Sequence, residues 1–391
     1  MKTAILLAWR NLIGAGTRTW LNVIVLSFSF LVIIWLKGIL LGWDYQAKSD
    51  MSHWEIGGGQ YWHEEYDPYD PFTLADSHAP IPEQCAGEIA GGEMTPLLLV
   101  QGTLYPQGRM QSVTIRGVDP AQQIFLLPTH QLDSAATALP AIIGHSMAQD
   151  MQLQEGDHLT LRWRDAAGTF DATEILIAGI FASNVPAIEN GQLYLALERL
   201  WEMTGLEGEA TLLTYRDEEA VRTDLAGWVH KPKEELTASV DRLIRTKSAG
   251  QSVFYLILLL LAMLAIFDTQ ILSIFRRQKE IGTYIALGYT RREVVGLFTL
   301  EGAMHALLAV LLSAVYGIPF LAWQARVGWT IPMDAGEFGM AMAQTLYPMY
   351  SVGLVLSTML IVLVTTTLVS YWPSRKIAKM NPTEALRGRI Q

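Results

Sequence analysis

The sequence predicts an integral membrane protein with four transmembrane α-helices and a large α+β extracytoplasmic domain inserted between helices 1 and 2. Hydrophobic residues make up 51% of the 391 positions and charged residues only 17%. The mean hydropathy of +0.24 lies between the values typical of soluble and of wholly membrane-embedded chains. Four apolar stretches are long enough to cross a bilayer. Lys and Arg also gather beside some span ends and avoid others, which indicates a fixed orientation.

The four spans are the first structural elements that follow from these stretches. They cover residues 21–42, 251–275, 294–322 and 349–372. Because the bilayer core holds no water, each span must be helical to satisfy its backbone polar groups. Trp20 and Trp43 bracket the first span as interfacial aromatic residues do, and no small-residue cleavage site precedes Trp43. We therefore expect an uncleaved anchor.

Charge placement predicts the topology. The 1–20 tail, expected to be an amphipathic helix, the 276–293 loop and the 373–391 tail are all rich in Lys and Arg, so they are predicted to be cytoplasmic. Segment 43–250 has 13 Lys and Arg against 31 Asp and Glu, and loop 323–348 has Arg326 as its one basic residue. Both are predicted to be external. We expect a chain of the bacterial inner membrane, with both termini cytoplasmic and a periplasmic domain at 43–250.

The external domain has about 208 residues, enough to fold around its own core. With Cys85 as the one cysteine, it has no internal disulfide. Alternating β-rich runs and turn signals predict strands and short helices, and a longer helix is expected to return the chain to the membrane. An aromatic-rich segment, 54–82, has little periodicity and is expected to be an ordered loop that carries recognition. The predicted strands are 97–105, 111–117, 158–163 and 174–181, the short helices 146–153 and 196–204, and the returning helix 217–249.

Several function classes are disfavoured by composition and motifs. A net charge of -10 argues against a nucleic-acid binder, and no Gly-Lys dipeptide exists from which a phosphate-binding loop could be built. Ser146 lies in a sequence similar to a nucleophile elbow, but Ala148 replaces its last glycine, so we expect a strand-turn-helix without catalysis. Histidines in the 51–82 region do not have the spacing of a compact metal site, so a surface loop is the favoured interpretation; they are His53, His63 and His78.

Polar residues within the spans are the first candidate sites. Asp268 should face the bundle or a cavity because an unpaired carboxylate in lipid is costly. Glu301 and His305 are one helical turn apart and could form a polar pair. For all three, interhelical packing and a transport role remain equally open. Gly38 and Gly42 form a GxxxG motif, which predicts a helix interface.

Two cytoplasmic blocks carry a family resemblance. The loop block and the tail block together resemble the type VII, mechanotransmission-type permeases of ABC transporters, the MacB/FtsX/LolC-LolE family. The layout, one span followed by a large domain without a fused ATPase, is most similar to the LolC/LolE-like members. The loop positions are Arg276, Arg277, Glu280, Ile281, Gly282, Ala286, Leu287 and Gly288, and the tail positions are Pro382, Glu384, Ala385, Leu386 and Arg387.

The resemblance implies that these residues couple the chain to a separate ATPase. A short helix with ends at Gly282 and Gly288 would dock on an ATPase dimer, which binds ATP and Mg, while this chain is not an enzyme and holds no cofactor. The family also implies a second permease copy or paralogue. Lipoprotein release is the favoured function. Alternatives are efflux of a small amphiphile or glycolipid with a periplasmic adaptor, or a scaffold that regulates a cell-wall hydrolase.

Overall fold

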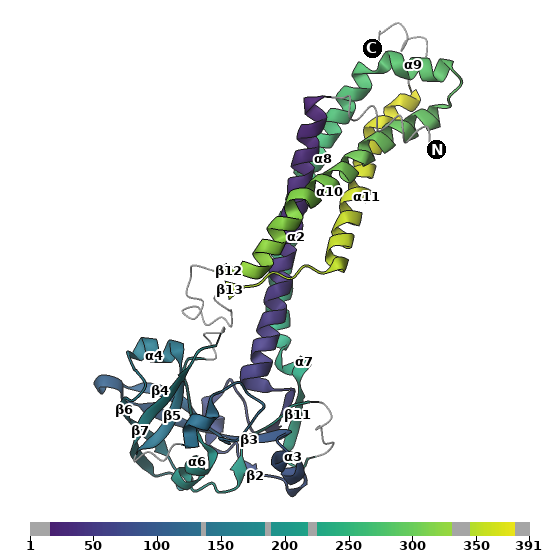
Figure 1. Cartoon of the computed structure of the whole chain (residues 1–391). Coiled ribbons are helices and arrows are strands. Elements are labelled where there is room, and N and C mark those ends of the chain that lie inside the picture. The colour runs from purple at the N-terminus through teal and green to yellow at the C-terminus, as the bar shows by residue number, and fades with distance from the viewer. Residues whose placement is uncertain (1–15, 134–137, 184–188, 218–224, 331–344, 380–391) are drawn as a thin grey trace. The chain divides into compact units, whose positions relative to one another are not determined.

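The computed structural model describes residues 16–133, 138–183, 189–217, 225–330 and 345–379. The chain forms two compact units, which we name by their content (Figure 1). The membrane unit comprises residues 1–42, 244–329 and 347–391, and the sheet unit comprises 43–243 and 330–346.

Within the described ranges, four helices are long and apolar enough to cross a membrane, as the sequence predicts. They are α2 (Thr17–Met51), α8 (Ala238–Arg276), α10 (Arg291–Val327) and α11 (Val352–Ser374). Helices α2 and α8 are longer than their predicted spans because hydropathy marks only the apolar part of a helix. Beyond that part, α2 continues with polar residues, where Lys48 Nζ pairs with Asp44 at 3.0 Å, one turn earlier.

The membrane unit packs around a core to which all four helices contribute. Its buried side chains include Phe30 of α2, Ile266 of α8, Ala309 of α10 and Val362 of α11. Helices α10 and α11 lie side by side over much of their length (Figure 1). Small residues at their contact, such as Gly302 of α10 against Ser370 of α11, allow the close approach that helix packing in lipid requires.

The GxxxG motif of Gly38 and Gly42 was predicted to contact another helix. This prediction is wrong, because the motif contacts an extended segment. Gly38 O accepts a hydrogen bond of 2.9 Å from Met349 N, in the extended segment that precedes α11. A side-chain Cβ at Gly38 would lie 2.2 Å from the Tyr350 ring, and one at Gly42 would lie 2.1 Å from Tyr347 O. The motif permits any backbone to approach closely, so it does not distinguish a partner helix from an extended segment.

The sheet unit is built on a nine-stranded mixed sheet with the order β11-β1-β10-β3-β4-β8-β5-β7-β6. A further pairing of β3 with β6 closes six of these strands, β3, β4, β8, β5, β7 and β6, into a ring. Strand β3 is long enough to pair with β10 at one end and with β6 at the other. The strands of the sheet are β1 (Gly59–His63), β3 (Met94–Leu104), β4 (Gln111–Val118), β5 (Leu139–Gly144), β6 (His158–Arg164), β7 (Phe170–Phe181), β8 (Gln192–Ala196), β10 (Leu212–Tyr215) and β11 (Trp228–Pro232).

Alternating strand residues fill the interior of this ring. Ile115, Ile143, Leu161 and Leu193 come from four different strands and are fully buried in one cluster. Helices α4 (His145–Met151) and α6 (Leu197–Thr204) add apolar side chains to the same cluster. Burying each such side chain contributes about 1.5–3 kcal/mol, so the unit has a core of its own without a disulfide.

The remaining elements are short. Strand β2 (Ala79–Pro80) pairs with β9 (Glu209–Ala210), and β12 (Trp329–Thr330) pairs with β13 (Thr345–Leu346). Helix α3 spans Ala86–Ala90, α7 spans Lys233–Leu236 and α9 spans Gln278–Ala286. A π-helix, η1 (Ser52–Ile56), follows α2, and 3-10 turns occur at Pro71–Ala75, Glu83–Cys85, Pro106–Gly108, Thr129–Asp133 and Arg375–Lys379.

All four predicted strands and both predicted short helices are present, but two segments differ from expectation. The 54–82 segment is not a loop throughout, because it contains β1, which pairs with β10 and β11 inside the sheet. The 217–249 segment is not one helix, because β11 and α7 precede α8. In both places the strand is held by neighbours that are distant in sequence, so local periodicity does not reveal it.

Candidate functional site

The candidate site is the turn between α8 and α10, which contains the resembling loop block. Helix α8 ends at Arg276, and Arg277 leaves the helical conformation with φ -101° and ψ 20° before α9 begins. Helix α9 ends at Ala286, and Gly288 follows with φ +97°, a left-handed conformation that favours glycine. Thr290 then starts α10 with a capping box, in which Thr290 and Glu293 satisfy each other's backbone N–H groups.

The inner face of α9 anchors it to the membrane unit. Ile281 is fully buried against Ile274 of α8, Phe298 of α10 and Ile377, which follows α11. Gly282 is buried in the middle of α9, so the expectation that it ends the helix is wrong. A glycine can be required either by a turn or by close packing against a neighbour. Sequence alone does not distinguish these two roles, so the position of Gly282 inside the helix was not predicted.

Arg277 ties α9 to α10 through its guanidinium. Its Nε donates to Glu280 Oε2 at 2.7 Å, and its Nη1 donates to both carboxylate oxygens of Glu301, at 3.0 and 2.8 Å. The guanidinium also lies over the Phe298 ring, 4.9 Å from its centroid. The Glu301 side chain is only 7% exposed, so this ion pair is largely shielded from water and depends on good hydrogen-bond geometry.

The outer face of α9 and the turn after it are exposed. Lys279, Thr283 and Ala286 are spaced as one helical face, and Leu287 next to them is 73% exposed. Tyr289 is also exposed, and its ring contacts Tyr284 edge to face. The turn therefore presents an apolar knob with a polar rim. Arg276 is exposed as well.

The structure brings together the loop half of the predicted set only. Pro382, Glu384, Ala385, Leu386 and Arg387 lie outside the described residues. The described part of the tail nevertheless reaches the site through Ile377, which is fully buried in the same cluster as Ile281. Sequence reasoning missed Ile377 as a contact, although its apolar side chain within a basic tail was an available signal.

The intramembrane polar residues lie differently from the prediction. Glu301 and His305 do not pair through their side chains: Glu301 binds Arg277, and His305 Nδ1 donates to the Glu301 carbonyl oxygen at 3.0 Å. Asp268 is exposed on the surface of α8 and does not face the bundle. Its neighbour Thr269 accepts a hydrogen bond from Asn22, close to the start of the first span. Asp268 therefore lies near the edge of the apolar region, where a carboxylate reaches water at low cost.

A polar layer that the sequence did not predict crosses the membrane unit at this level. Gly302 of α10 lies against Ser370 of α11 and Gln270 of α8, and a Cβ at Gly302 would be 2.0 Å from Ser370 Oγ and 2.9 Å from Gln270 Nε2. Asn22 of α2 completes the layer through its 2.5 Å hydrogen bond to Thr269 Oγ1. All four long helices therefore meet through polar or small residues at one depth.

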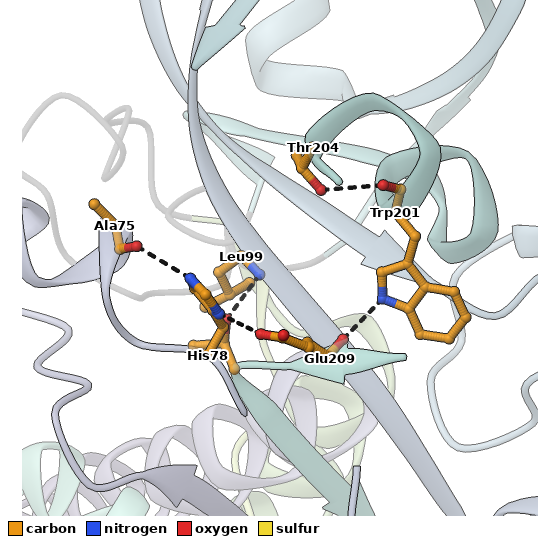
Figure 2. A network of polar contacts seen from close by, with 7 residues as sticks. Ala75, His78, Leu99, Trp201, Thr204 and Glu209 are labelled. Atoms are coloured by element: carbon orange, nitrogen blue, oxygen red, sulfur yellow. Dashed lines mark hydrogen bonds and ion pairs between the residues drawn. The ribbon is translucent and has the colours of Figure 1, made fainter. Parts of the chain in front are cut away.

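In the sheet unit, the weaker candidates have structural partners. Ser146 lies in the first turn of α4, directly after β5, as the strand-turn-helix interpretation expects, and its Oγ donates to Glu189 Oε2 at 2.6 Å. His78 lies between Glu209 and the Ala75 carbonyl oxygen (Figure 2). His53 contacts Ser49, and His63 Nδ1 accepts from its own turn. Among the described residues, no three His, Cys, Asp or Glu side chains gather as metal ligands.

The aromatic-rich segment lines a cleft of about 710 Å³ in the sheet unit. Its floor contains Arg116, 9% exposed, which donates to Glu55 Oε1 at 3.0 Å. Trp62 lies on one wall with Lys231 Nζ 5.6 Å from its ring centroid, and Tyr66 contacts Trp62 edge to face. The cleft combines aromatic rings with charged groups, which suits an amphiphilic ligand.

Residues 252–382, about a third of the chain, match the model of the FtsX-like permease C-terminal domain. This FtsX-like region contains α9, Arg277 and Glu301. The chain is 24% identical over 165 residues to the macrolide export ATP-binding/permease protein MacB of Sodalis glossinidius, which is 40% of this chain and 23% of that protein. It is 28% identical over 130 residues to an uncharacterized ABC transporter permease of Methanocaldococcus jannaschii, 33% of this chain and 30% of that protein. The chain thus spans less than a third of the length of either relative.

Proposed function

We propose that this chain is a permease subunit of an ABC transporter in the bacterial inner membrane. Four apolar helices, an FtsX-like region and similarity to two ABC permeases support this function. The charge asymmetry supports cytoplasmic termini and a periplasmic sheet unit. In this proposal the chain is not an enzyme, and ATP and Mg are bound by a partner ATPase.

The turn containing α9 is the proposed coupling element. The observation that carries this is the Arg277 contact with both Glu280 and Glu301, which holds α9 on α10 while Leu287 stays exposed. An exposed leucine on a rigidly held turn is a suitable anchor for a pocket on another protein. Two ATPase subunits would engage two permeases, so a second copy or a paralogue of this chain completes the assembly.

A charge substitution at the knob tests the coupling proposal. Leu287→Asp should abolish co-purification of the ATPase with the tagged chain, because it puts a carboxylate into the proposed pocket. Leu126→Asp is the matched control, since Leu126 is 61% exposed in the sheet unit. It should leave co-purification unchanged. If Leu287→Asp retains the ATPase at the control level, α9 is not the docking element.

For the cargo, we propose release of a lipoprotein from the membrane by motion of the periplasmic unit, without a central pore. The large sheet unit and the cleft beside Trp62 support a lipophilic or amphiphilic cargo. Export of a small amphiphile with a periplasmic adaptor is the second candidate, and similarity to a macrolide export protein favours it. A volume of about 710 Å³ lies within the range of small-molecule sites.

Proteoliposomes with the complete transporter separate these candidates. ATP-dependent release of a fluorescent diacylated lipopeptide to a soluble acceptor supports lipoprotein release. ATP-dependent movement of a macrolide supports amphiphile export. ATP hydrolysis that moves neither would contradict both cargo proposals and favour a scaffold that regulates a cell-wall hydrolase.

A further inference from the structure

A groove between α10 and α11 has no role in the proposed coupling. Its volume is about 650 Å³, and it lies within the membrane unit. On α10 its lining follows one helical stripe, with Arg292 at the end and then Gly296, Thr299 and Ala303. Tyr371 and Arg375 line the opposite wall. The groove thus has a basic end and a narrow floor of small residues.

The small side chains make the groove hollow. A Cβ at Gly296 would meet no atom within 4 Å, so the space above this residue is open. This contrasts with Gly302 on the same helix, where a Cβ would be 2.0 Å from Ser370 Oγ. One glycine of α10 therefore serves helix packing, and the other leaves a surface groove.

The polar layer fixes the depth of the groove. Asn22, beside Trp20 at the start of the first span, lies at the level of Thr269, and Gln270 lies at the level of Gly302. This layer therefore marks the edge of the hydrocarbon region. Ala303 is next to the layer, whereas Arg292 is eleven residues from Ala303, or about 16 Å along the helix. The headgroup region is about 5–8 Å thick on each side, so the groove runs from the apolar edge at Ala303 through this region, with Thr299 within it and the backbone of Arg292 beyond it.

The positive charges at the end of the groove lined by Arg292 and Arg375 indicate an anionic ligand. Arg292 and Arg375 are both exposed, and neither has an ion-pair partner within the part of the chain that the structure describes. Guanidinium groups bind phosphate through paired hydrogen bonds. Tyr371, 46% exposed, adds an aromatic ring and a hydroxyl of the kind found at headgroup depth. Basic pockets between membrane helices bind anionic lipid headgroups in this way.

We propose that this groove binds one anionic phospholipid. Its phosphate contacts the side chains of Arg292 and Arg375, its glycerol lies over Gly296 and Thr299, and its acyl chains enter the hydrocarbon region beside Ala303. The groove is separate from the outer face of α9. If no lipid binds in the groove, the proposed docking of the ATPase on α9 is unaffected. A lipid bound here would hold the start of α10 and the end of α11 together, beside the coupling turn.

Native mass spectrometry of the full chain tests the proposal. The detergent-purified protein is incubated with phosphatidylglycerol or with phosphatidylcholine of the same acyl chains. The wild type should retain phosphatidylglycerol in preference by on the order of tenfold or more, as expected for two arginines near the headgroup. Arg292→Gln with Arg375→Gln should lose this preference. Arg109→Gln with Arg199→Gln, which removes the same charge from the sheet unit, should keep it.

A second variant tests whether lipid binding requires the open groove or only the two positive charges. Gly296→Leu fills the groove and leaves both arginines, so it should also reduce retention of phosphatidylglycerol. Equal retention of both lipids by the wild type, or full retention by the double Arg variant, overturns the proposal. Equal competition by glycerol phosphate would indicate a free anion instead. A disulfide between two copies of a Gly296→Cys variant would show that a second chain covers the groove, which also overturns it.

Discussion

Removing the Arg277 side chain should destabilise the membrane unit more than its partly exposed position suggests. The Nη1 atom makes two hydrogen bonds, of 3.0 and 2.8 Å, to a carboxylate that is 7% exposed. Breaking such a shielded pair typically costs about 3–5 kcal/mol, because the remaining charge stays buried. The bond to Glu280, whose side chain is 56% exposed, adds little. We therefore expect Arg277→Gln to lower the free energy of unfolding by about 3 kcal/mol.

A double-mutant cycle isolates the pair itself. Arg277→Met and Glu301→Leu are measured singly and together, by denaturant titration of the chain in detergent micelles. The double variant should be more stable than Arg277→Met alone, since no carboxylate is left behind, and the coupling energy should be about 2 kcal/mol. Arg199→Gln is the control: this arginine pairs with Glu202 on the surface of the sheet unit, so its removal should not shift the unfolding midpoint.

The result that would refute this reasoning is a coupling energy within error of zero. Arg277 and Glu301 would then be neighbours that do not stabilise each other, and α9 would be held only by the apolar cluster around Ile281. A measurement of ATPase coupling on the same variants provides a second readout. If the Arg277–Glu301 pair fixes α9, each single variant should lose the coupling between ATP hydrolysis and transport.

Two further predictions concern packing and topology. Gly302→Ala should cost about 1–3 kcal/mol of stability, because its Cβ would lie 2.3 Å from Ser370 Cβ, which no rotation can move away; Gly353→Ala, with open space on α11, should cost nothing, and equal thermal shifts would contradict the packing. For topology, Phe72→Cys and Leu287→Cys place thiols at positions 91% and 73% exposed, while the natural cysteine is buried. An impermeant thiol reagent should label the first in intact spheroplasts and the second only after lysis, and the reverse pattern would invert the proposed orientation.

Sequence predicted those features that depend on local composition. Apolar length is enough to identify a membrane helix, so all four were found, and alternation with turn signals located strands such as β4 and β6 within a residue or two. The turn around α9 was located as well, because charged residues surround it and Gly288 follows its last residues, although the end predicted at Gly282 was wrong. These signals do not require knowledge of any distant contact.

Features that depend on distant partners were missed or misplaced. The strand β1 has little periodicity because it lies between two neighbours, and Gln60 on it is buried beside Thr214. Asp268 was expected to face inward because an unpaired carboxylate in lipid is costly, whereas the contact between Asn22 and Thr269 places it near the edge of the span. The partner of Glu301 was sought one turn away on the same helix, but it belongs to the turn after α8.

The single non-helical residue between α8 and α9 has a mechanical consequence. Arg277 is both the joint between these helices and, through its side chain, a clamp onto α10. A push on Leu287 therefore reaches α10 by two polar or covalent routes, the Arg277 clamp and the short turn through Gly288, whereas it reaches α8 through the backbone of Arg277 and the apolar contact of Ile281 with Ile274. The turn works as a bracket that joins the second and third membrane helices, so in the proposed transporter the stroke of a docked ATPase would move the ends of α8 and α10 together.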